Sequence, residues 1–217
     1  MVHVKHLACV ATLAGVTASV SAGPVFNLNI EFSGATPPAG AAPWMTVSFT
    51  QGTGLNSAHV FMTIQNYLVA AEFVDRVLIN VDPANVPNPG AVANLPSYET
   101  GTEADDGVFG KASNPLMDTF YKADGDGFFD YRFNWSANTF GGVQSVVYKF
   151  TGMTASWFNF VSEPGGGQGR YFAVAKVQGI GAGGDSGWIG YIPLPSAAGM
   201  AFMGLLGLGC VRRRPAL

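Results

Sequence analysis

Hydrophobic and polar residues alternate with a period of two through most of the chain. Between Phe26 and Phe32, for example, every second residue is a large apolar one. This period places the two sets of side chains on opposite faces of an extended strand. The pattern predicts β-strands in the segments 26–32, 45–49, 59–64, 76–81, 129–135, 146–150, 158–160 and 172–176.

Clusters of Gly, Pro, Asn and Asp separate these segments, and none has a convincing helical period. Ala70 to Val77 is the best helical candidate, but the β-branched run from Val77 to Val81 argues against it. Short strands separated by turn residues are typical of β-sandwiches and barrels. We therefore predict one all-β domain over residues 23–190, a jelly-roll-like β-sandwich, flanked by a signal peptide and a C-terminal membrane helix.

Two stretches lack the alternation and are expected to be loops. Residues 82–118 contain several prolines together with the acidic residues Glu99, Glu103, Asp105 and Asp106. Residues 164–169 are rich in glycine. A loop as long as 82–118 without secondary structure is usually functional or disordered.

Residues 1–22 have the composition of a secretory signal peptide. A short basic start precedes an apolar run from Leu7 to Val16, and Val20 and Ala22 place small residues at −3 and −1 of a cut before Gly23. The apolar run is too short to span ~30 Å of hydrocarbon. We predict cleavage between Ala22 and Gly23 and export of the rest of the chain.

Residues 191–217 form a second candidate targeting segment. The motif Pro193, Leu194, Pro195 precedes an apolar run from Ala197 to Val211, and the run ends at Arg212, Arg213 and Arg214. Arginines beside an apolar segment are held on the cytoplasmic side of a membrane. The segment is therefore predicted to be a single-pass or temporary anchor that leaves the preceding domain outside the cell.

This arrangement resembles the PEP-CTERM sorting signal of exported bacterial surface proteins, in which a Pro-containing motif precedes a transmembrane helix and an Arg cluster. The resemblance covers residues 192–217, with Pro-Leu-Pro where Pro-Glu-Pro is usual. It implies an exosortase-like processing enzyme as partner, the inner membrane as anchor, and delivery to the cell surface, the extracellular matrix or its exopolysaccharide. Residues 124–134 and 158–188 also look like the exported domains that carry this signal.

Composition excludes several classes of protein. Both cysteines, Cys9 and Cys210, fall in the terminal segments, so residues 23–192 contain no disulfide, no catalytic thiolate and no cysteine zinc site. Of the 11 Lys and Arg residues, seven lie in 23–192 together with all 14 Asp and Glu residues, which gives a net charge of −7. An acidic domain repels nucleic acid and suits neutral glycans or divalent cations.

Asp124, Asp126 and Asp130 form the strongest local motif for a ligand. Carboxylates at relative positions 1, 3 and 7, with glycines between them, resemble the way calcium loops bring oxygens onto one cation. A carbonyl near Phe128 would complete the set, and the acidic residues 99–106 could supply missing ligands. The alternative is a plain Asp-Gly turn without metal.

Two further motif matches carry less weight. His59, Asp106 and Ser186 stand in the chain order of a chymotrypsin-like protease, but too little chain follows Ser186 to complete a second barrel. Residues 179–184 match the dinucleotide-binding glycine pattern, but no helix follows to hold a pyrophosphate. Neither match is expected to be functional.

The function predicted from these observations is that of a non-enzymatic exported protein of the cell surface or extracellular matrix. One alternative is a carbohydrate-binding β-sandwich module, which would show a row of exposed aromatic side chains. Another is a secreted glycan hydrolase, which would show two close carboxylates with raised pKa values in a cleft. The aromatic candidates are Trp135, Trp157 and Trp188, which we expect to pack in the core.

Overall fold

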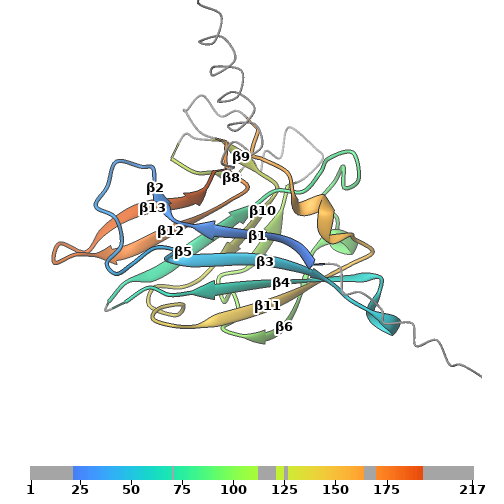
Figure 1. The fold of residues 1–217 in the computed structure, drawn as a ribbon, viewed down its shortest axis with the longest axis horizontal. Helices are drawn as coiled ribbons and strands as arrows, with labels where there is room; N and C mark the ends of the chain where they lie inside the picture. Colours follow the sequence, from blue (N-terminus) through green and yellow to red (C-terminus); the bar gives the residue numbers. More distant parts are fainter. Residues whose placement is uncertain (1–21, 70, 112–120, 125–126, 164–169, 193–217) are drawn as a thin grey trace, which may run out of the picture.

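The computed structural model describes residues 22–69, 71–111, 121–124, 127–163 and 170–192 (Figure 1). Among the described residues it is nearly all β, with 46% of them in strands and no helix of seven or more residues. Every strand pair is antiparallel. In these described ranges, no helix is long and apolar enough to span a membrane.

The strands form two large sheets and a small hairpin. The first sheet contains, in spatial order, β1 (Ala22–Leu28), β3 (Met45–Gln51), β4 (His59–Asn66), β11 (Ser145–Thr151) and β6 (Ser97–Gly101). The second contains β2 (Ile30–Glu31), β13 (Asp185–Tyr191), β12 (Ala173–Ile180), β5 (Phe73–Ile79), β10 (Tyr131–Asn134) and β7 (Val108–Gly110). The hairpin pairs β8 (Tyr121–Lys122) with β9 (Phe128–Phe129).

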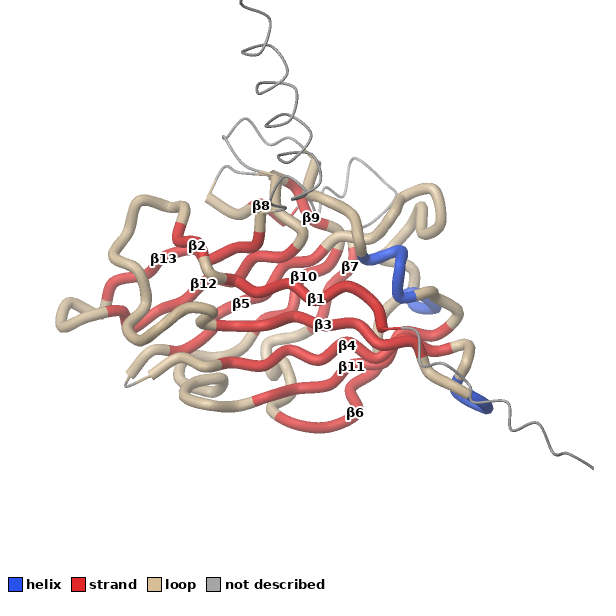
Figure 2. Tube along the Cα trace, viewed as in Figure 1, coloured by secondary structure: helices blue, strands red, loops and turns tan. Residues whose placement is uncertain are grey.

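Short 3-10 turns complete the fold. They are η1 (Gly54–Asn56), η2 (Val92–Asn94) and η4 (Ala155–Phe158). Figure 2 shows that the helical turns gather at one end of the sheets. At the opposite end of the sheets, the described connections between strands are loops without 3-10 turns.

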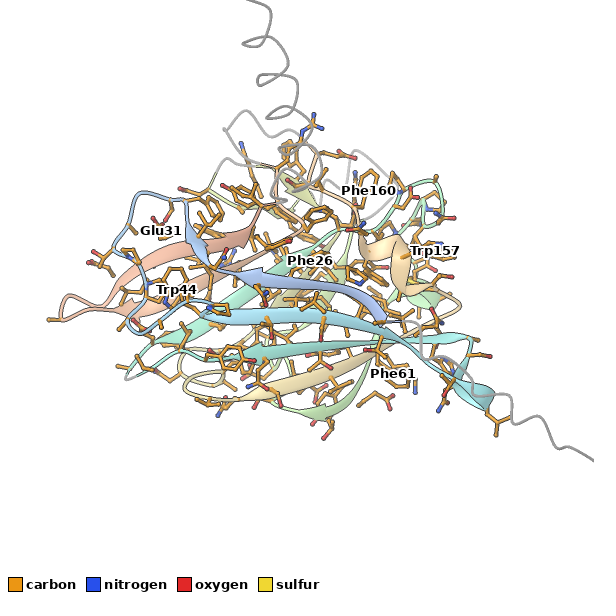
Figure 3. All side chains as sticks on the ribbon, in the orientation of Figure 1. Phe26, Glu31, Trp44, Phe61, Trp157 and Phe160 are labelled. Atoms are coloured by element: carbon orange, nitrogen blue, oxygen red, sulfur yellow. The ribbon has the colours of Figure 1, made fainter. Side chains whose placement is uncertain are left out.

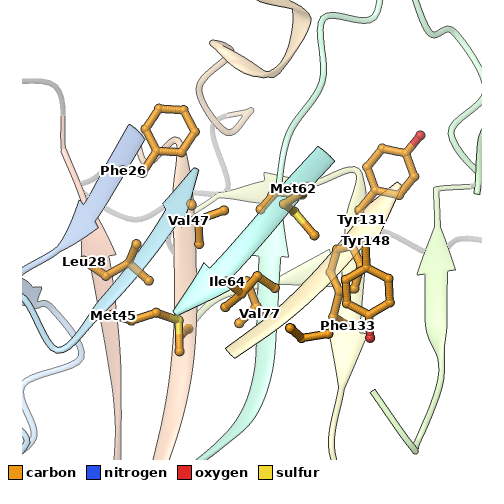
Figure 4. Packing of buried hydrophobic residues seen from close by; sticks show 14 of the residues in the cluster. Phe26, Leu28, Met45, Val47, Met62, Ile64, Val77, Tyr131, Phe133 and Tyr148 are labelled. Atoms are coloured by element: carbon orange, nitrogen blue, oxygen red, sulfur yellow. The ribbon is translucent and has the colours of Figure 1, made fainter. Parts of the chain in front are cut away.

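The inner faces of the two large sheets share one hydrophobic core. Along β3 and β4 the alternate residues are fully buried, as the period of two predicts. Aromatic rings join the sheets directly, with Tyr131 and Phe150 centroids 5.3 Å apart and Phe133 and Tyr148 centroids 4.8 Å apart. Figure 4 shows the rings of Tyr131, Phe133 and Tyr148 near the side chains of Val47 on β3, Met62 and Ile64 on β4 and Val77 on β5.

The chain passes from one sheet to the other at Asn29, between β1 and β2. Just before this residue, the Leu28 carbonyl accepts a hydrogen bond from the Trp44 amide at 3.1 Å. The Asn29 amide donates to the Gly190 carbonyl, in the second sheet, at 3.2 Å. A strand that switches sheets in this way joins two layers along one edge without a loop.

The outer face of the six-stranded sheet carries a second, smaller apolar cluster. Leu78, Val174 and Trp188 project from it, and Tyr121 and Phe129 of the β8–β9 hairpin pack onto them. The hairpin therefore covers part of this outer face.

The structure confirms strands in seven of the eight predicted segments, corrects two expectations and adds a strand, β13, that no predicted segment covers. Residues 158–160 are not a strand, because the 3-10 turn η4 delivers the Phe158 ring onto Phe49, with centroids 4.2 Å apart. The long stretch 82–118 is not devoid of structure, since β6 and β7 lie within it. The glycine-rich residues 185–191 form β13, whose inner and outer faces both pack.

Candidate functional site

A cleft of about 820 Å³ lies where β1 passes the turn η4, next to the neighbouring ends of β12 and β13. Figure 3 labels Phe26 on β1 and Trp157 on η4, the two elements that border the cleft. The volume is within the 300–1,000 Å³ range typical of small-molecule sites. It is therefore large enough to hold a ligand rather than only water.

One wall of the cleft is aromatic. The rings of Phe26 and Phe172 stack with centroids 5.0 Å apart, and Tyr191 lies 5.6 Å from Phe26. Phe172 and Tyr191 are half-buried, whereas Phe26 is buried. The partly exposed rings give the cleft an apolar surface on which a flat ligand can stack.

The rim of the cleft also carries uncharged polar side chains. Ser57, Thr154, Ser156 and Asn159 are exposed, and none of their side chains makes a hydrogen bond within the described part of the chain. Thr154 precedes η4 without capping it. These hydroxyl and amide groups are free to bind a ligand.

Gln51 holds this rim in place. Its Nε2 donates to the Ser57 carbonyl at 2.8 Å and to the His59 carbonyl at 3.0 Å, while its Oε1 accepts from the Ala155 amide at 2.9 Å. One side chain thus links the end of β3 to the η1 loop and to η4. The rim is positioned by the fold before any ligand binds.

Gly23 allows β1 to pass close under η4. A Cβ at this position would lie 2.5 Å from the Phe49 carbonyl oxygen and 2.7 Å from the Ala155 Cβ. Glycine is therefore needed here for close backbone approach, independently of any role in signal-peptide cleavage. The predicted cleavage pair Ala22–Gly23 forms the start of β1, with Ala22 paired to Thr50.

The cleft has no charged chemistry of its own. Among the described residues that line it there is no Asp, Glu, Lys, Arg or His. The described lining residues can offer hydrogen bonds and aromatic stacking.

The predicted calcium residues are only partly described. Asp124 is exposed and has a φ of 44°, and Asp126 lies outside the described residues. The Asp130 Oδ2 accepts a hydrogen bond from the Val81 amide at 3.0 Å, and burial raises the pKa of this carboxyl to about 6. No group of three metal-ligating side chains occurs within the described ranges.

Two of the four acidic residues of the 99–106 stretch have partners elsewhere in the fold. Glu99 forms an ion pair with Lys149 of β11. Asp105 accepts hydrogen bonds from the Ser136 amide at 2.7 Å and the Thr139 hydroxyl at 3.3 Å, and the first of these lowers the pKa of its carboxyl. These two carboxylates stabilise loops next to them.

The protease-like residues do not assemble into a triad. His59 Nδ1 lies 3.2 Å from the Thr151 hydroxyl, its cross-strand neighbour. Ser186 lies on β13 in the other sheet, and no hydrogen bond joins either residue to Asp106. The glycines of 179–184 instead form the β12–β13 hairpin, where Gly179, Gly181 and Gly184 have positive φ.

The tryptophans belong to the packed interior, as expected. Trp135 and Trp188 are buried, and Trp157 is half-buried against the core. They therefore form no exposed row for sugar stacking, and the partly exposed rings at the cleft are Phe172 and Tyr191 instead. The predicted sorting residues Pro193, Leu194, Pro195, Arg212, Arg213 and Arg214 lie outside the described residues.

Comparison with protein-family models, curated proteins and solved structures finds no match for this chain. The site is therefore defined by geometry alone. Sequence reasoning missed it because its residues come from β1, β3, η4, β13 and the position just before β12, which the chain order separates widely. The one available signal was the run of small polar residues around Thr154 and Ser156, which lies between the predicted strands 146–150 and 158–160.

Proposed function

We propose that this chain is an exported, non-catalytic protein of the cell surface or extracellular matrix whose domain binds a neutral glycan in the cleft beside β1. The observation that carries the proposal is the lining of the cleft. Hydroxyl and amide groups without hydrogen-bond partners among the described residues line the same cleft as two partly exposed aromatic rings, and no carboxylate lies among the described lining residues.

This combination matches the chemistry of an uncharged sugar. Sugar hydroxyls both donate and accept hydrogen bonds, as the side chains of Ser57, Thr154, Ser156 and Asn159 do. The apolar face of a sugar ring packs on aromatic rings such as those of Phe172 and Tyr191. Cleavage before Gly23 would add an α-ammonium group near the rim, which is a further donor for hydroxyl oxygens.

The domain is proposed to be a jelly-roll-like β-sandwich that serves as a binding module. Two antiparallel sheets with a shared core support this architecture. A glycan hydrolase would need two carboxylates across the bound sugar. Asp130, the carboxylate with a raised pKa, does not line the cleft, and its Oδ2 accepts a hydrogen bond from the Val81 amide.

Export and sorting complete the proposal. The signal-peptide pattern of residues 1–22 and the Pro-Leu-Pro, apolar and Arg segments of residues 193–214 support secretion followed by exosortase-like processing at the membrane. A matrix protein delivered in this way would meet polysaccharide at the cell surface.

The test is native affinity electrophoresis of the purified protein in gels that contain neutral polysaccharides such as dextran, galactomannan or hydroxyethyl cellulose. At least one polysaccharide should retard the wild type. The triple variant Thr154→Ala, Ser156→Ala, Asn159→Ala should bind it at least about tenfold more weakly, because each lost hydrogen bond contributes about 0.5–1.5 kcal/mol.

The matched control is Asn27→Ala, Thr100→Ala, Ser186→Ala, which removes three exposed polar side chains outside the cleft. This control should bind as the wild type does. Equal retardation of both triple variants, or no retardation of the wild type by any neutral polysaccharide, would overturn the proposed site. Release of reducing ends from the bound polysaccharide would overturn the absence of catalysis.

A further inference from the structure

The basic residues of this acidic domain are concentrated on one surface. Arg76 of β5, Arg132 of β10 and Lys176 of β12 lie on the outer face of the six-stranded sheet, and Lys122 of β8 lies beside them. These four are among the seven basic residues of a stretch with net charge −7. Such segregation creates a local positive potential on a molecule that is negative overall.

Three of these cations converge on a small pocket. Arg76, Lys122 and Arg132 line a pocket of about 80 Å³ together with Leu78 and Tyr121. A water molecule takes up ~30 Å³ of liquid volume, so the pocket has room for a single carboxylate-sized group. The size and the charge both suit one oxyanion.

Two aromatic rings hold the Arg132 guanidinium in place. Its guanidinium lies 4.7 Å from the Phe109 ring centroid and 4.6 Å from that of Tyr121, so the two rings fix its plane by cation–π contact. Its Nε is buried without a hydrogen-bond partner, and the guanidinium forms no ion pair with a described residue. A rigid, unpaired guanidinium is well suited to bind an oxyanion through two parallel hydrogen bonds.

The neighbouring carboxylate does not neutralise the pocket. Arg76 and Lys176 are direct cross-strand partners, and a β-bulge in β5 places Asp75 between them. Asp75 Oδ2 lies 2.8 Å from Arg76 Nε and 4.0 Å from Lys176 Nζ. This one carboxylate relieves the repulsion between those two cations, and none of the ion pairs among the described residues involves Lys122 or Arg132.

We propose that this pocket binds one carboxylate group of an acidic polysaccharide, the uronate of a sugar residue. The Phe109 side chain, 40% exposed beside Arg132, would contact the sugar ring while the cations hold its carboxylate. A nucleic acid requires a long row of phosphate contacts, which a single pocket on a negative domain does not provide. The pocket and the neutral cleft share no lining residue, so this proposal does not depend on the cleft.

The test is calorimetric titration of the purified protein with trigalacturonate. Its fully methyl-esterified form is the matched neutral ligand, and inorganic sulfate and phosphate are the free-anion probes. Trigalacturonate should bind, and the ester should bind at least tenfold more weakly, because esterification removes the charge but keeps the sugar.

Variants locate the site. Arg132→Met should weaken trigalacturonate binding at least tenfold, and Lys122→Met, at an exposed position that perturbs the fold little, should weaken it severalfold. The matched control Arg170→Met removes an exposed cation that does not line the pocket and should bind normally. The cleft triple variant should also bind trigalacturonate normally, so failure of one site is distinguishable from failure of the other.

Three results would overturn the proposal. The ester could bind as tightly as the acid, which would show that the carboxylate is not recognised. Arg170→Met could weaken binding as much as Lys122→Met, which would show only diffuse attraction. Sulfate or phosphate could bind as tightly as trigalacturonate, which would show a site for free anions rather than for a glycan.

Discussion

At the residue scale, burial of Asp130 opposes its ionisation. The folded pKa of about 6 lies above the value of 3.8 expected in the unfolded chain. Between about pH 4 and pH 6 the folded state therefore holds a proton that the unfolded state has lost, and the free energy of unfolding falls as pH rises through this window. Above pH 6 both states are ionised, and the destabilisation is constant.

We expect Asp130→Asn to stabilise the protein at pH 7.5 by at most about 3 kcal/mol, since each pKa unit corresponds to 1.36 kcal/mol. The amide oxygen can still accept the hydrogen bond from Val81. Urea unfolding at pH 4.5 and 7.5 measures the free energy of unfolding. The difference in this free energy between the two pH values should be smaller in the variant than in the wild type. Asp185→Asn, a change of the same charge at an exposed side chain of the β12–β13 hairpin, is the control and should have a small effect. A loss of stability at pH 7.5 in Asp130→Asn would show that the charged carboxylate is needed.

Calcium binding at Asp124, Asp126 and Asp130 stays a prediction, and its test is separate from the pH test. An extracellular module with a Kd of ~10⁻⁴–10⁻³ M would be stabilised by about 1.4 kcal/mol at calcium ten times above Kd. The Tm should therefore rise in millimolar calcium, and Asp126→Ala should abolish the rise.

The control for calcium is Asp185→Ala, which removes an exposed carboxylate from the β12–β13 hairpin. This variant should keep the full calcium response. Identical melting curves of the wild type in EDTA and in calcium would contradict the metal site. They would support the alternative, a turn without metal whose aspartates accept hydrogen bonds from the backbone.

At the scale of elements, the period-two pattern predicts strands well wherever one face is apolar and the other polar. β3, β4 and β11 follow this rule, since each pairs along its length and buries every second side chain. β13 was missed because glycines replace side chains at Gly187 and Gly190, where neighbouring side chains pack against the bare backbone. β6 was missed because its five residues are all exposed, so no apolar period marks it.

The sites were harder to predict than the strands because they depend on long-range pairing. The uncharged rim of the cleft comes together through Gln51, whose hydrogen bonds reach Ala155 across 104 positions of sequence. The cationic pocket depends on the bulge at Asp75 and on the β8–β9 hairpin, neither of which a local pattern reveals. Burial of Trp135, in contrast, follows from its place in the alternating segment 129–135.

At the scale of the whole molecule, localisation is proposed to depend on the basic C-terminus. Replacing Arg212, Arg213 and Arg214 by Ser should release or mislocalise the protein, because the charge that orients the anchor is lost. Cell fractionation and the mass of the mature protein provide the measurement. Replacement by three lysines keeps the charge and should leave both unchanged. Normal fractionation and mass in the Ser variant would contradict the predicted anchor.

The position of β13 also determines how the molecule would carry tension. Held through residues 193–217 as proposed, the protein would receive a pull from the membrane at Tyr191, the last residue of β13 and a lining residue of the cleft. A force along the strand acts at the same time on all the residue pairs between β13 and β12, rather than on one pair after another. These pairs run from Ala173–Tyr191 to Ile180–Asp185. Resistance to such a pull is set by the rate of forced unfolding. The glycan cleft would then sit at the loaded end of the strand, directly on the line between polysaccharide and membrane.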